Sequence, residues 1–132
     1  MAILDLTKAL YLKMSTSGFP VSTGLRRAGD STPAVIYEIT QIDIDFAMRG
    51  VASGSYTMQV SIDCVANTAL EAWDVASEMI TQLDTNVVDN VNNISFIIST
   101  ATASARTEVP DDGQSDAERV VTLVLTILAK EI

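Results

Sequence analysis

Within residues 55–66, a strict alternation of apolar and polar residues over 56–64 constrains the fold of this chain more than any other feature. Every second position is apolar, and the row consists of Tyr56, Met58, Val60, Ile62 and Cys64. Because successive side chains of a strand point to opposite faces, this period predicts a strand with one buried face and one face open to water or to a partner. We interpret Cys64, the last of the row, as a small apolar core residue rather than a reactive thiol.

Three further segments have strand patterns. Residues 34–46 alternate, but the phase slips near Thr40-Gln41, which predicts a β-bulge there. Residues 93–109 begin with apolar residues in phase and end in an arm of Thr, Ala and Ser. Residues 117–129 are largely apolar at both odd and even positions, which is typical of a central strand or of one covered by another chain.

Two segments have helical spacing. In residues 2–15 one apolar face is formed by Ile3, Leu6, Leu10 and Met14, and a second by Leu4, Tyr11 and Leu12, so this helix is expected to contact a partner as well as its own core. Thr68 and Glu71 form a capping box that opens the other helix. Its apolar stripe comprises Ala69, Ala72, Trp73, Ala76, Met79, Ile80 and Leu83. We expect Trp73, the only tryptophan, to anchor this helix on the sheet.

The element order is therefore predicted to be α-β-β-α-β-β. This order favours an α+β fold, a two-layer sandwich in which two hairpins form a mainly antiparallel four-stranded sheet with two helices on one face. The length of 132 residues is that of a single domain, 1–132. Residues 16–33 are predicted to be irregular, with room for a short extended piece around Phe19–Val21.

The composition argues against most catalytic chemistry. The chain has no histidine and one cysteine, which removes histidine-dependent catalysis, disulfides within the chain and nearly all zinc sites. No phosphate-binding or dinucleotide-binding glycine motif is present, and we expect no catalytic residue, no cofactor and no metal. Asp43 and Asp45 share one face of a strand and leave two alternatives, a divalent-ion site of a small metal-dependent enzyme or a solvent-exposed strand edge.

The net charge of −9 opposes a tight grip on DNA phosphates or on an anionic membrane. The N-terminus has no basic region of the kind that opens a signal peptide, and no apolar run approaches the ~18 residues of a membrane span. We expect synthesis in a reducing cytoplasm and no membrane partner.

Several stretches resemble the small tail-terminator or tail-completion proteins of long-tailed bacteriophages and of phage-like particles such as gene transfer agents. They are Pro33–Tyr37 at the start of a strand, Val60–Thr68 before a helix that carries Glu71-Ala72, Ala76 and Leu83, and the acidic turn Glu108–Glu118 that leads into Arg119–Leu128. The resemblance covers nearly the whole chain in element order, and it rests on apolar patterns rather than on a catalytic signature. The segment 16–33 departs from it, since similar proteins often have a more extended, proline-rich approach to the first strand.

The resemblance implies a structural virion protein rather than an enzyme. Such proteins form hexameric rings that dock on the last ring of tail-tube subunits, stop tube growth and present the surface for joining to the head, while DNA passes through the central hole. The implied partners are further copies of the chain, the tail-tube protein and a head-completion or connector protein. The implied location is the head-proximal end of the tail, after synthesis in the cytoplasm of a bacterial host. Another head–tail connector or a tail-tube component remains an alternative.

Apolar surfaces without a use in a monomer indicate where copies of the chain meet in such a ring. They are the second face of the first helix and the Ala/Thr/Ser arm. The expected interface residues are Leu4, Tyr11, Leu12, Ala101, Ala103, Ala105 and Glu108.

Overall fold

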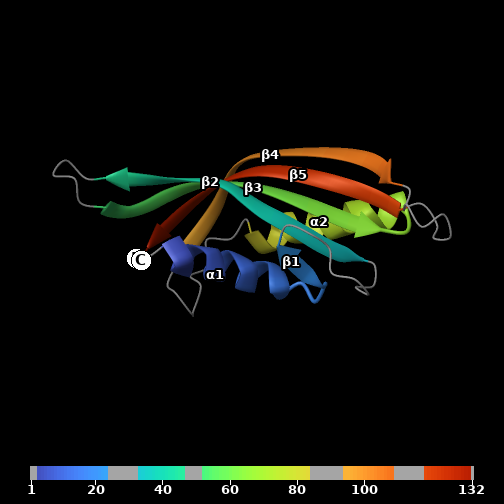
Figure 1. The fold of residues 1–132 in the computed structure, drawn as a ribbon, viewed down its shortest axis with the longest axis horizontal. Coiled ribbons are helices and arrows are strands. Elements are labelled where there is room, and N and C mark those ends of the chain that lie inside the picture. The colour runs from blue at the N-terminus through green and yellow to red at the C-terminus, as the bar shows by residue number, and fades with distance from the viewer. Residues whose placement is uncertain (1–2, 24–32, 47–51, 84–93, 109–117, 132) are drawn as a thin grey trace.

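The structure is a computed structural model, and it describes residues 3–23, 33–46, 52–83, 94–108 and 118–131. Within these described residues, two helices and five strands follow one another (Figure 1). In order they are α1 (Ile3–Ser15), β1 (Val21–Thr23), β2 (Ala34–Phe46), β3 (Ala52–Ala66), α2 (Ala69–Leu83), β4 (Ile94–Glu108) and β5 (Glu118–Glu131).

The strands form one five-stranded mixed sheet in the order β1-β2-β3-β5-β4, so the predicted four-stranded antiparallel sheet is corrected in one respect. The four long strands pair antiparallel, as expected, but β1 adds a parallel edge strand beside β2. The Val35 N–H donates to the Pro20 carbonyl at 2.8 Å and fixes the start of this pairing. β1 is too short to produce a periodic pattern, and for this reason the sequence indicated only an extended piece near it.

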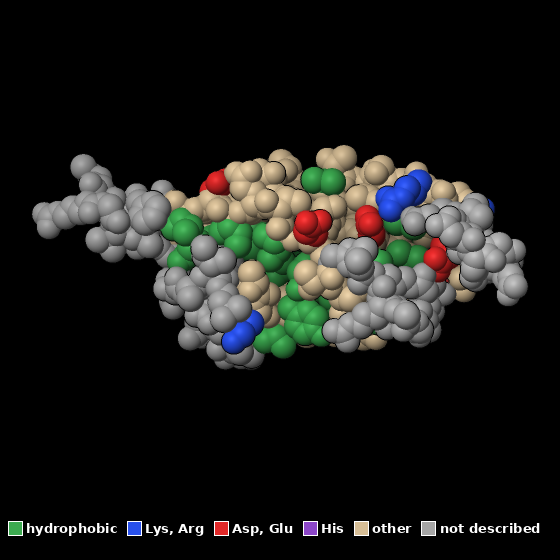
Figure 2. All heavy atoms as spheres, in the orientation of Figure 1, with side chains coloured by type: hydrophobic (Ala, Val, Ile, Leu, Met, Phe, Trp, Pro, Cys, Tyr) green, Lys and Arg blue, Asp and Glu red, His purple; other side chains and the backbone are tan. Residues whose placement is uncertain are grey.

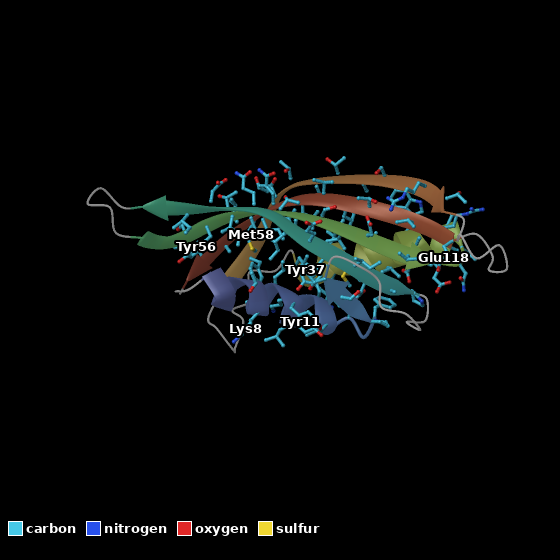
Figure 3. The ribbon with its side chains drawn as sticks, viewed as in Figure 1. Lys8, Tyr11, Tyr37, Tyr56, Met58 and Glu118 are labelled. Carbon is cyan, nitrogen blue, oxygen red and sulfur yellow. The ribbon has the colours of Figure 1, made fainter. Side chains whose placement is uncertain are left out.

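Both helices lie on the same face of the sheet, which we call the helix-covered face, and the opposite face is called helix-free (Figure 1). α2 packs over β3 and β5, whereas α1 lies beside β1 and contacts α2. The alternating row of β3 is fully buried in the core between sheet and helices, as predicted. In Figure 3, Tyr37 and Met58 extend from the sheet toward α1, while Lys8 and Tyr11 lie on the far side of that helix.

Local signals in the sequence placed the end of α1 and the start of α2 correctly. Gly18 adopts a φ of 86° just after α1, a conformation that glycine accepts without strain, and its N–H donates to the Ser15 carbonyl. At the start of α2 the Glu71 N–H donates to the Thr68 hydroxyl oxygen at 3.2 Å, which is the first half of the predicted capping box. The Thr16 hydroxyl donates to Gln82 Oε1 at 2.7 Å and ties the end of α1 to α2.

The prediction that Trp73 anchors α2 in the core is wrong. Its side chain is 44% exposed, and the buried residues of α2 are Ala72, Val75, Ala76, Met79 and Leu83. At 100° per residue, Trp73 lies one step around the helix from Ala72, at the margin of the buried stripe, and the narrow space above the sheet is filled by smaller residues. Among the described residues, the largest fully buried side chain is instead that of Phe96 on β4.

The predicted bulge in β2 is confirmed. The pairing of β2 with β3 shifts between Ile39 and Gln41, so the residues after the shift keep their apolar side chains on the helix-covered face. A comparable shift between Ile98 and Thr100 in β4 places Ala101 opposite Leu125, on the helix-covered face.

Candidate subunit interface

The strand β4 forms one edge of the sheet and pairs only with β5. Ala101, Ala103 and Ala105 pair with Leu125, Leu123 and Val121, whose side chains belong to the core. We call these three alanines the alanine row. All three are exposed, because α2 lies over β3 and β5 and reaches β4 only in part. The described helices thus leave these alanines uncovered, and we call the open strip above them the channel.

Sequence reasoning missed an exposed apolar part of α2. Leu70 is 84% exposed, and with the exposed Trp73 it forms what we call the α2 patch. A cavity of about 310 Å³ separates Trp73 from the ends of β4 and β5, and its other lining residues include Ala69, Ala105, Thr107 and Arg119. The spacing of three residues between Leu70 and Trp73 puts both on one side of the helix, which was the available signal.

The expected α1 contact lies on another side of the molecule. Tyr11 is 43% exposed and Leu12 is 39% exposed, in agreement with a second apolar face. The side chains of Leu4 and Glu108 are outside the described residues. Within one chain the structure does not bring α1 and the alanine row together, since α1 lies beside β1 and the row lies on the opposite edge strand.

The helix-free face of the sheet carries many hydroxyl side chains (Figure 2). It also exposes the apolar side chains of Ile97, Val124 and Leu128, in agreement with the apolar pattern on both faces of the last strand. Among its charged groups, Arg106 is held by neighbours on two strands. Its Nη1 donates to the Thr122 hydroxyl at 2.7 Å, and its Nη2 lies 3.5 Å from Asp63 Oδ2. The Thr122 hydroxyl also donates to Asp63 Oδ1 at 2.7 Å. This exposed ion pair adds little stability, but it places an anion beside the cation that would otherwise attract phosphates.

Of the carboxylate pair considered as a metal site, the structure describes the side chain of Asp43 alone. Asp43 accepts both of its described hydrogen bonds from Gln41 Nε2, at 2.9 and 3.0 Å. The side chain of Asp45 lies outside the described residues. Across the described ranges, no three residues of the types Asp, Glu, Cys and His gather in a way that could hold a metal ion.

Cys64 behaves as the sequence predicted. It is buried, and burial together with the neighbouring Asp63 charge raises the pKa of the Cys64 thiol to about 12. Such a thiol stays protonated and is a poor nucleophile. In the part of the chain that the structure describes, no helix combines the length and the apolar character needed to cross a bilayer.

Comparisons with known proteins show a shared fold, and none of them shows a family. No family model matches this sequence, and no curated protein matches it. Among 32 matching chains of solved structures, one belongs to a structure titled "Virion of native gene transfer agent (GTA) particle". It superimposes with a TM-score of 0.57 over 95% of this chain and 94% of that chain, at 14% identity. At this identity the likeness shows a shared fold over almost the full length of both chains.

Proposed function

We propose that this chain is a structural virion protein of a phage-like particle, in which it forms a ring that caps the tail tube. The observation that carries the proposal is the match in fold, from end to end, with a chain of a gene transfer agent particle. The resemblance of the apolar patterns to tail-terminator proteins, found from the sequence alone, supports the finer role.

A ring of identical head-to-tail contacts buries apolar surfaces that a monomer leaves exposed. The alanine row and the α2 patch lie near one edge of the sheet, and Tyr11 and Leu12 lie on the helix beside the other. With a net charge of −9 per copy, six copies repel one another at low ionic strength. Free subunits therefore associate weakly, and docking on the end of a tube adds the remaining driving force.

The helix-free face is the surface that suits a DNA channel. It presents many short polar side chains beside the exposed Ile97, Val124 and Leu128. Its Arg106 is paired with Asp63, so a passing duplex meets few free cations to hold it. The excess of acidic residues in the whole chain also weakens the attraction of DNA phosphates. We place this face toward the channel and the helices toward the outside of the ring.

The capping role is tested by deleting the coding sequence in the producing strain and measuring tail lengths in negatively stained particles. We expect tails of variable, greater length that lack heads, and a normal length distribution after the wild-type chain is restored. Tails of normal length joined to heads in the deletion strain would contradict the capping role. Complete loss of tails would instead identify a tube component, the alternative function.

A further inference from the structure

The two edges of the sheet are complementary in direction. Three successive antiparallel pairings connect β2, β3, β5 and β4, so β4 runs opposite to β2. β1 pairs with only Val35, Ile36 and Tyr37, and the described remainder of β2 has one side without a strand of its own chain. When a second copy stands beside the first in the same orientation, its β1–β2 edge faces β4 and runs antiparallel to it. Backbone hydrogen bonds can then continue from one sheet into the next.

The helix layers are complementary as well. α2 covers the helix-covered face of β4 only in part, so Phe96 is buried there whereas the alanine row is exposed. On the opposite edge, α1 lies beside β1. Continuing the sheet into a second copy therefore brings the α1 of that copy over or beside the alanine row, where methyl side chains permit a close approach.

The charges of the two helices identify a second copy as the occupant of this channel. α2 contains Glu71, Asp74 and Glu78 and no basic residue, whereas α1 contains Lys8 and Lys13 against one acid, Asp5. Neighbouring α1 and α2 helices thus attract each other, although the whole chain is strongly acidic. An unrelated acidic partner would not be attracted electrostatically to the acidic helix α2.

We propose that copies of this chain associate head to tail by pairing β4 of one copy with the β1–β2 edge of the next, with the neighbour's α1 seated on the alanine row and against the α2 patch. Tyr11 and Leu12 of the neighbour then cover Trp73 and Leu70. The contact rests on the ring of the proposed function and specifies how that ring is built. Because one side of the contact differs from the other, it propagates until the ring closes.

The contact is tested by cross-linking cysteines with a short bismaleimide. The natural Cys64 is buried with a raised thiol pKa, so it gives no background. The double variant Tyr11→Cys/Ala103→Cys should give a ladder of covalent oligomers that ends at the ring size. The experiment is run on the purified chain at high salt and on intact particles.

The single variants are the matched controls and reveal the symmetry of the contact. Tyr11→Cys alone and Ala103→Cys alone should remain uncross-linked, while a mixture of the two single variants should give dimers and nothing larger. Cross-linking of either single variant would indicate a two-fold contact and overturn the proposal. Absence of a ladder from the double variant in both preparations would overturn it too.

A second pair of variants tests the channel without cross-linking. Ala103→Arg fills the channel with a bulky cation and should weaken self-association at least about tenfold, equivalent to 1.4 kcal/mol, in sedimentation experiments. Gln59→Arg makes the same change in charge on the helix-free face of the central strand β3 and should associate like the wild type. Equal association of both variants would overturn the proposal.

The outcomes separate this contact from the capping role. A ladder together with normal tails in the deletion strain supports the contact and contradicts capping. No ladder together with overlong tails in the deletion strain contradicts the contact and supports capping.

Discussion

Alkaline pH should destabilise the fold through Cys64, and the structure gives both the sign and the size of the effect. The folded thiol has a pKa of about 12, against 9.0 for an unperturbed thiol. Its contribution to stability is therefore complete below pH 9 and is lost as the pH rises toward 12, because only the unfolded chain releases the proton in that window. Between pH 7 and pH 10 the loss amounts to about 1.4 kcal/mol.

The assay is urea unfolding at pH 7 and pH 10, followed by far-ultraviolet circular dichroism, for the wild type and for Cys64→Ala. Other groups titrate in the same window, so the quantity of interest is the difference between the two proteins in their loss of unfolding free energy. The variant should lose about 1.4 kcal/mol less than the wild type over this interval. Equal losses in both proteins would show that the Cys64 thiol is open to water and that the buried face of β3 is misplaced.

Three further predictions follow from the core and the helix ends. Phe96→Ala should lower the free energy of unfolding by about 3–5 kcal/mol, because Phe96 is fully buried. Trp73→Ala should lower it by less than about 2 kcal/mol, because Trp73 is 44% exposed. A larger loss for Trp73→Ala in urea unfolding would show that this side chain is buried in the core. Thr68→Ala removes the hydroxyl that accepts the Glu71 N–H and should cost about 1 kcal/mol by the same measurement, whereas no change would show that this cap is not formed in solution. Tyr11→Asp should leave the monomer folded, as measured by circular dichroism, but should prevent ring formation and normal tail length. Tails of ordinary length in this variant would show that α1 is not part of the interface.

The long strands could be predicted from the sequence because their burial has a strict period of two. The row that contains Met58 and Ile62 needs only one buried face, and a one-residue slip near Thr40 is visible as a change of phase. The two-residue period of a strand is enough to predict strands and bulges from such patterns. The capping box at Thr68 is equally local, since its partners are three residues apart.

The features that the sequence did not reveal depend on contacts between distant segments. Trp73 is apolar and lies beside the buried stripe of α2, but its exposure follows from how far that helix sits from β4. Likewise, β1 becomes an edge strand of the sheet only by pairing with Val35 and its neighbours. For the candidate interface, the sequence singled out the alanine row, which the structure shows to be exposed, and its place in an interface stays a prediction. The exposure of the α2 patch could be recognised only from the packing of α2 on the sheet.

Cryo-electron microscopy of intact particles tests the central claim most directly, because it locates the chain in the assembly. The account predicts a closed ring of copies with this fold at the head-proximal end of the tail tube, with the helix-free face toward the DNA and β4 of each copy beside the β1–β2 edge of the next. Finding the fold elsewhere in the particle, or finding particles that lack the chain altogether, would contradict it.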